Sequence, residues 1–197
     1  MLTANIANTG TVSYVYDGEG RRVQKTVALA VTNFVYDATG NLVAEYSNAA
    51  PQAAGTQYLF DDHLGSTRLV TDGSTVKRYD YLPFGEEIPS GMDGRGTDYG
   101  AQVVPPTTPD VVNQKFTSKE RDAETGLDDF GARYYSSAQG RFMSVDPSYE
   151  SQILELPQTW NRYSYVYNRP TFATDPDGRC PPCIGAIVGG LLREVGI

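Results

Sequence analysis

Histidine and cysteine are scarce in this 197-residue sequence, which contains one histidine and two cysteines. The cysteines form the motif Cys180-Pro-Pro-Cys183, a spacing that suits a redox pair or half of a zinc site. Zinc needs more ligands than this pair and His63 supply, and a redox Cys-x-x-C motif normally opens a helix in a βαβ unit. We therefore predict neither a bound metal nor a cofactor.

Long apolar runs and clusters of basic residues are also missing. The apolar segment Ile184–Leu192 is far shorter than the run of about 20 residues that spans a bilayer. The first residues lack the basic and apolar regions of a signal peptide, so nothing directs classical secretion. The formal charge is −8 and lysines and arginines are scattered singly, which argues against a nucleic-acid partner.

Glycine, proline and tyrosine are plentiful, with 20, 12 and 14 residues, which favours short strands joined by turns and predicts a mainly β fold. Two copies of one unit occur at 12–23 and 34–43. In each, alternating aromatic and β-branched residues lead to an aspartate, Asp17 or Asp37, with a glycine three positions later. Aspartate closes turns and glycine supplies a positive φ, so we predict stacked antiparallel hairpins, with a related unit at 58–73.

The stretch 114–179 is dense in aromatic residues and contains two Asp-Pro dipeptides, at Asp146 and Asp175. Because rings at this density need packing partners, we predict a compact core there. Its members are Tyr134, Tyr135, Phe142, Tyr149, Trp160, Tyr163, Tyr165, Tyr167 and Phe172.

Common catalytic groups have little support outside the aspartates. His63 lies in a Leu-Gly-Ser context with no cysteine nucleophile beside it, and a turn or cap role is the simpler interpretation. Ser66 and Ser144 lack the Gly-x-Ser-x-Gly frame of a hydrolase elbow.

Several short motifs occur in an order that resembles the RHS repeat-associated core domain of RHS/YD-repeat polymorphic toxins. The match covers about residues 12–179. Its pieces are Asp62-His-Leu-Gly-Ser-Thr-Arg68, Tyr79-Asp-Tyr-Leu-Pro-Phe-Gly85, Phe116-Thr-Ser-Lys-Glu-Arg-Asp122, Gly131-Ala-Arg-Tyr-Tyr135, Gly140-Arg-Phe142 with Asp146-Pro147, and Tyr163-Ser-Tyr-Val166 with Asp175-Pro-Asp-Gly178.

The resemblance implies an end cap on a hollow shell of coiled YD repeats that encloses a C-terminal toxin. It also implies one aspartyl-type self-cleavage just after a Pro-x4-Asp-Pro-x-Gly motif. That motif is met here by Pro170, Asp175, Pro176 and Gly178, with Asp177 at the variable position. The implied scissile bond joins Arg179 to Cys180.

Amide hydrolysis by carboxylates needs one ionised acid to activate water and one protonated acid to polarise the carbonyl. Two carboxylates about 3 Å apart cannot both ionise, which separates their pKa values. Asp146 and Asp175 are the predicted pair, with Asp177 as the substitute for Asp146. Arg141 is the predicted orienting cation, because a guanidinium can hold a carboxylate through two donors.

A purely structural interpretation stands beside this one, because Asp175-Pro-Asp-Gly178 also suits a type I turn. The chain departs from the family pattern at Arg179, where a large apolar residue is usual, and a charged side chain there favours solvent over a cleavage site.

We expect repeat strands at 1–87, a flexible Gly/Pro-rich insertion at 88–113, the cap with short helical turns at 114–179, and the start of a truncated variable region at 180–197. The chain is thus expected to be an isolated end piece without its effector. Expected partners are the rest of the shell, a C-terminal toxin segment and secretion machinery. The resemblance implies secreted or cell-surface delivery by a non-classical route. The alternative function is a non-enzymatic module that binds carbohydrate or a partner protein through its tyrosines.

Overall fold

The computed structural model describes residues 2–6, 10–38, 42–49, 56–100, 110, 112–149 and 152–179. Within these ranges the chain is built from short antiparallel strands and single 3-10 turns, which confirms the predicted mainly β fold. It divides into two compact units, 1–51 and 52–197. Among the described residues there is no helix with the length and apolarity needed to cross a membrane.

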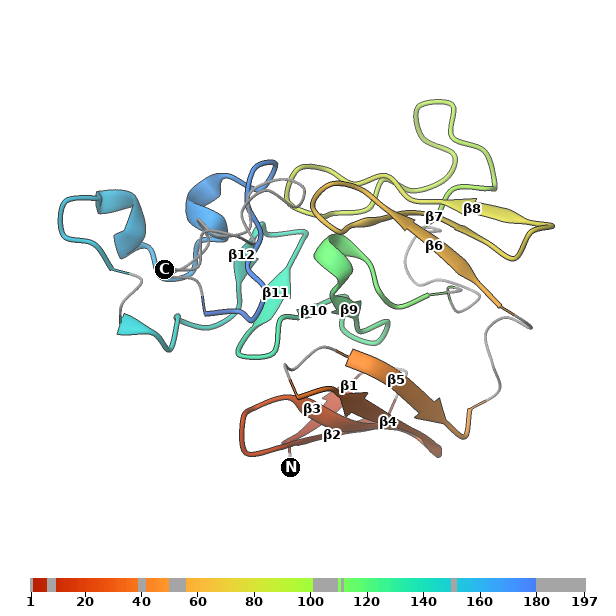
Figure 1. Ribbon diagram of the computed structural model, residues 1–197, viewed down its shortest axis with the longest axis horizontal. Helices are drawn as coiled ribbons and strands as arrows, with labels where there is room; N and C mark the ends of the chain where they lie inside the picture. The colour runs from red at the N-terminus through yellow and green to blue at the C-terminus, as the bar shows by residue number, and fades with distance from the viewer. Residues whose placement is uncertain are drawn as a thin grey trace. The chain divides into compact units, whose positions relative to one another are not determined.

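The first unit is a five-stranded antiparallel sheet in which each strand pairs with the next along the chain (Figure 1). Its buried residues include Val12, Tyr14 and Phe34, which come from the alternating segments that predicted the hairpins. Its strands are β1 (Leu2–Ile6), β2 (Gly10–Tyr16), β3 (Arg22–Val27), β4 (Ala30–Tyr36) and β5 (Leu42–Ser47).

The hairpin unit repeats in its details. The ladder slips at Val15/Tyr16, directly before Asp17, and the same irregularity recurs at Val35/Tyr36 before Asp37. In the first turn the Asp17 carboxylate accepts the N–H groups of Glu19 (3.0 Å) and Arg21 (2.8 Å). An aspartate that satisfies turn N–H groups is the feature that the sequence pattern predicted.

The second unit begins with a three-stranded sheet of β6 (Tyr58–Asp61), β7 (Thr67–Thr71) and β8 (Val76–Arg78) (Figure 1). The β6–β7 hairpin repeats the same turn, because Asp62 accepts the N–H groups of Leu64 (2.9 Å) and Ser66 (3.0 Å). The third copy of the repeat therefore has the predicted structure.

Part of the predicted flexible insertion is tied back to the β8 region. Ile88 N–H donates to the carbonyl of Asp80 (2.8 Å), and Gly100 N–H donates to that of Arg78 (2.6 Å). Arg95 forms an ion pair with Asp80 at 2.9 Å. Residues 88–100 thus form a hydrogen-bonded excursion rather than a loose loop, whereas 101–109 lie outside the described residues.

The cap begins at a 3-10 turn, η1, and contains a four-stranded sheet in the order β12-β11-β10-β9. The chain then continues through two more 3-10 turns to Arg179, the last residue described. The elements are η1 (Phe116–Ser118), β9 (Glu120–Arg121), β10 (Asp128–Asp129), β11 (Tyr134–Ser136), β12 (Arg141–Phe142), η3 (Pro157–Trp160) and η4 (Val166–Asn168).

Five rings from different elements of the cap form its core, with neighbouring centroids 4.9 to 6.0 Å apart in mostly tilted or edge-on pairs. Such contacts are worth about 0.5–1.5 kcal/mol each beyond the area they bury. The rings belong to Phe116, Phe130, Tyr135, Phe142 and Tyr165.

The prediction of a single aromatic core is correct for Tyr135, Phe142 and Tyr165. It is wrong for three others, because Tyr149, Trp160 and Phe172 keep 78, 54 and 47% of their surface exposed. These three lie outside the paired strands, where no alternation directs a side chain inward.

The last part of the cap lies along β11 and β12. Phe142 N–H donates to the carbonyl of Tyr163 (2.9 Å), and Ala132 N–H donates to that of Asp177 (3.1 Å). These bonds bring the second Asp-Pro turn next to Arg133, the residue that precedes β11.

Candidate functional site

The second Asp-Pro dipeptide forms a closed, buried turn. The Asp175 side chain has no exposed surface, and its Oδ1 accepts the N–H groups of Gly178 (2.8 Å), Arg179 (3.2 Å) and Asp177 (3.4 Å). Gly178 adopts φ 73°, a left-handed conformation that glycine accepts without strain. Asp175 is therefore a turn residue, as the structural interpretation expects, and its second oxygen remains available for another partner.

That partner is the guanidinium of Arg133. Its Nη2 lies 3.3 Å from Asp175 Oδ2 and 3.2 Å from Asp146 Oδ2. Two oxygens within 3.3 Å of one nitrogen are separated by less than twice that distance, so both predicted carboxylates contact the same guanidinium. Arg133 and both acids are buried, with 3% exposure or less.

The remaining donors of Arg133 bind backbone carbonyls. Nε donates to the carbonyl of Gly178 (2.6 Å) and Nη1 to that of Arg162 (3.0 Å). The guanidinium carbon lies 3.6 Å from the centre of the Phe142 ring. One side chain thus joins both acids to the backbone carbonyl of the chain's last described turn, with a fixed fork of donors that a lysine could not reproduce.

Asp146 is held by its own Asp-Pro turn. Its Oδ1 accepts the N–H of Ser148 (2.8 Å), its N–H donates to the carbonyl of Arg162 (3.1 Å), and the Arg162 guanidinium donates to its carbonyl. These bonds fix the carboxylate at the edge of a small pocket.

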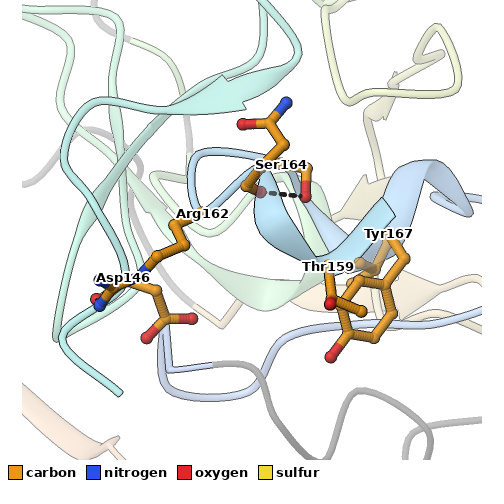
Figure 2. A pocket seen from close by; sticks show the side chains of 7 residues that line it. Asp146, Thr159, Arg162, Ser164 and Tyr167 are labelled. Atoms are coloured by element: carbon orange, nitrogen blue, oxygen red, sulfur yellow. Dashed lines mark hydrogen bonds between the residues drawn. The ribbon is translucent and has the colours of Figure 1, made fainter. Parts of the chain in front are cut away.

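The pocket beside Asp146 has space for about one water molecule. Figure 2 shows Asp146 and Arg162 on one side and Thr159 and Tyr167 on the other. Val166, another lining residue, has φ 40° and is followed by two more left-handed residues in η4. A β-branched residue in this conformation is strained, and such strain tends to gather at functional sites.

Burial shifts the pKa values of Asp175 and Arg133. It raises the pKa of Asp175 to about 6, although Arg133 and the turn N–H groups oppose that shift. Burial also lowers the pKa of Arg133, while the two acids oppose that change. Asp175 can therefore exchange a proton near neutral pH, as a general acid or base must.

The other predicted site residues are distributed differently. Arg141 is exposed, with its guanidinium carbon 4.7 Å from the centre of the Tyr163 ring, and Arg133 occupies the place that was predicted for it. Asp177 is exposed and its Oδ1 accepts the N–H of Arg179 (3.0 Å). Pro170 is buried, and Cys180 lies outside the described residues.

Sequence reasoning missed Arg133, although its motif Gly131-Ala-Arg-Tyr-Tyr135 was part of the resemblance. The signal was present, because Arg133 lies two positions before the core residue Tyr135 and Arg141 lies one position before the core residue Phe142. Both neighbouring strands are too short for alternation to show which arginine faces inward.

The histidine and serine candidates of the sequence form no site among the described residues. His63 is exposed in the turn closed by Asp62, and Ser144 is exposed. Ser66 is buried and accepts the N–H of Thr117 (3.0 Å). Among the described residues there is no group of three or more His, Cys, Asp or Glu that could hold a metal ion.

No protein-family model matches the chain. It is 34% identical over 175 residues to the tRNA3(Ser)-specific nuclease WapA of Bacillus spizizenii, which covers 84% of this chain and 7% of that protein. It is 31% identical over 221 residues to Salivary gland surface protein 1 of Aedes aegypti, covering 92% of this chain and 6% of that protein. It is 31% identical over 131 residues to toxin subunit YenC1 of Yersinia entomophaga, covering 64% of this chain and 11% of that protein.

Solved structures have the same fold. The crystal structure of TcdB2-TccC3 matches with a TM-score of 0.56 and 23% identity, covering 85% of this chain and 9% of that one. The Tc holotoxin pore of Photorhabdus luminescens matches with a TM-score of 0.53 and 21% identity, covering 90% of this chain and 9% of that one.

The relatives include WapA nucleases, the YenC toxin subunits and the toxin protein Tse5, so the chain is related to RHS-type polymorphic toxins. It spans only 6 to 11% of the length of the relatives compared above.

Proposed function

We propose that this chain is the core-associated end piece of an RHS-type toxin, where it closes one end of the shell and cuts the chain once between Arg179 and Cys180. The observation that carries the proposal is the convergence of Asp146 and Asp175 on one nitrogen of Arg133. The Asp175 turn also contains the residues that lead directly to the proposed scissile bond. The partners would be the remaining shell and the C-terminal segment that the cut releases.

The two acids have different surroundings and therefore different roles. Asp146 borders the one-water pocket and takes a proton from a water molecule there. Asp175, whose pKa burial raises to about 6, is the acid that can carry a proton at the start. The water oxygen bonds to the carbonyl carbon of Arg179, the bond to the Cys180 nitrogen breaks, and the new amine leaves with the proton of Asp175.

A turn aspartate elsewhere in the chain provides a matched control for the test. Asp72 is exposed and accepts the N–H groups of Ser74 (2.8 Å) and Thr75 (2.7 Å), much as Asp175 accepts those of its own turn. Replacing Asp72 changes a turn carboxylate without touching the acid pair.

The experiment is to express the chain with a C-terminal tag and to follow its intact mass after folding. We expect the unsubstituted chain and Asp72→Asn to yield a fragment beginning at Cys180, and Asp146→Asn and Asp175→Asn to stay whole. An unsubstituted chain that remains intact, or an Asp175→Asn chain that is cut at the normal rate, contradicts the proposal.

A second candidate function, binding of carbohydrate or a partner protein, is favoured by aromatic residues on the edge strand β6. Tyr58 and Phe60 each keep 57% of their surface exposed, and Leu59 keeps 41%. Exposed aromatic faces can stack on sugar rings or pack against a protein. Glycan-array binding that is lost in Tyr58→Ser, in a chain that is never cut, would support this candidate over the first.

A further inference from the structure

Three successive carbonyl oxygens of the last described turn are each held by a donor from residues 119–133. The Lys119 ammonium donates to the carbonyl of Pro176. Ala132 N–H donates to that of Asp177 (3.1 Å), and Arg133 Nε donates to that of Gly178 (2.6 Å).

The other side of the same backbone is held as well. The N–H groups of Asp177, Gly178 and Arg179 all point to Asp175 Oδ1. The segment that leads to the proposed scissile bond is therefore fixed from both sides, and its register relative to the acids cannot slip. Hydrolysis depends on this, because a displacement of about 1 Å at a reacting centre can cost about 100-fold in rate.

Lys119 is the one donor of the three that can be removed without touching the acids or the backbone. It directly follows η1, it is half-buried, and its ammonium lies 5.4 Å from the centre of the Phe130 ring. Burial lowers the pKa of Lys119, while the charges of Asp175, Asp129 and Asp177 oppose that shift. The lysine is thus placed at the acid cluster without being part of the acid pair.

We propose that Lys119 is a positioning residue for self-cleavage, which holds the Pro176 carbonyl so that the scissile bond stays in register and adds positive charge beside Asp175. This inference rests on the proposed function. It assigns a task to the Lys119 side chain of the Phe116–Asp122 motif, which packing of the core does not explain.

The added charge has a consequence that a merely structural lysine would not have. Removing it raises the pKa of Asp175 further, so the step that titrates with Asp175 in the rate profile moves to higher pH. A role confined to packing would lower the rate by the same factor at every pH. The groups that act on Asp175 or share its partner are Arg133, Lys119, Asp146, Asp177, Tyr165 and Tyr167.

The test compares the tagged chain with Lys119→Met, Lys119→Gln and Lys119→Arg, and with Lys77→Met as a lysine control on β8. Each protein is purified in denaturant and diluted into buffers over a pH series centred on about 6. The uncut fraction is followed by intact mass and is normalised to the folded fraction measured by urea unfolding. Lys119→Gln keeps a hydrogen-bond donor without charge, so it provides a second reading where Lys119→Met folds poorly.

We expect Lys119→Met to be cut roughly tenfold or more slowly, with its rate profile displaced to higher pH. Lys119→Gln should show the displaced profile, and Lys119→Arg and Lys77→Met should resemble the unsubstituted chain in the profile. The inference is overturned if Lys119→Met keeps the normal rate and profile, or loses rate equally at every pH, while Asp175→Asn stays whole. An unsubstituted chain that is never cut instead overturns the proposed function, and the inference with it.

Discussion

Replacing Arg133 by methionine should destabilise the second unit more than any other single arginine change in the acid cluster. The substitution keeps the length of the side chain but removes four polar contacts, two to carboxylates and two to backbone carbonyls. It also leaves Asp146 and Asp175 buried without their shared cation. Removing one partner of a buried ion pair costs about 3–5 kcal/mol, and we expect the free energy of unfolding to fall by that amount.

The cost should not exceed this range, because Asp175 can take up a proton. Its pKa is already about 6 with the guanidinium present and rises further without it. At lower pH Asp175 becomes neutral and no longer needs the cation. The loss of stability in Arg133→Met should therefore be smaller at about pH 5 than at about pH 7.

The matched control is Arg141→Met, which replaces the arginine that sequence patterning selected. Arg141 is exposed, and its described contact is with the Tyr163 ring, so its loss should cost about 0.5–1 kcal/mol. Trp160, the single tryptophan, lies in the second unit, and its fluorescence during urea unfolding reports on that unit. If the free energies of unfolding of Arg133→Met and Arg141→Met differ by less than about 1 kcal/mol, the central role given to Arg133 is wrong.

Three further predictions concern the same unit and use the same unfolding assay. Because the pKa of Asp175 in the folded state is raised to about 6, this carboxyl contributes stability below about pH 4 that is lost as the pH rises through about 6. Asp175→Asn should flatten this decline of the unfolding free energy with pH. An unchanged dependence on pH would contradict the prediction. Gly178→Ala should cost about 1–3 kcal/mol of stability and slow the proposed self-cleavage, because an added Cβ would lie 3.1 Å from backbone atoms at φ 73°. The control Gly73→Ala, at φ 91° with nothing near its Cβ, should cost about 1 kcal/mol. Equal costs for the two variants would refute the steric argument. Gly85→Ala should cost about 3 kcal/mol or more, because its Cβ would lie 2.4 Å from the Phe116 ring in the core, and a loss below about 1 kcal/mol would show that this ring can move freely.

The repeat hairpins could be predicted in some detail because their pattern is local. An aspartate three residues before a glycine determines the turn by itself, and Asp17 and Asp62 form the same set of hydrogen bonds in different sheets. The strands between such turns carry the alternation that places Val12 and Phe34 inside. The turn residues and the alternation of apolar residues along the strands indicate the same hairpins, so most of this part of the fold can be predicted from the sequence.

The cap could be predicted only in part, because its strands are two or three residues long. Alternation over so few residues does not show which face a side chain takes, which is why Arg141 was selected and Arg133 was missed. The convergence of Asp146 and Asp175 depends on pairing across about 30 residues of chain, and no local pattern encodes it. The exposure of Tyr149 and Trp160 follows from irregular segments that the composition alone cannot orient.

The aspartate turn has a wider consequence. Asp17 and Asp175 use one carboxylate oxygen in the same way, to satisfy the N–H groups of the turn that follows. In the open turn those bonds lower the pKa of Asp17, whereas burial raises that of Asp175. The pKa of such a turn aspartate is therefore set by its burial rather than by the amino-acid motif around it. A variant that lets water reach Asp175 should lower its pKa towards that of an exposed turn aspartate such as Asp17, although every residue of the motif is still in place.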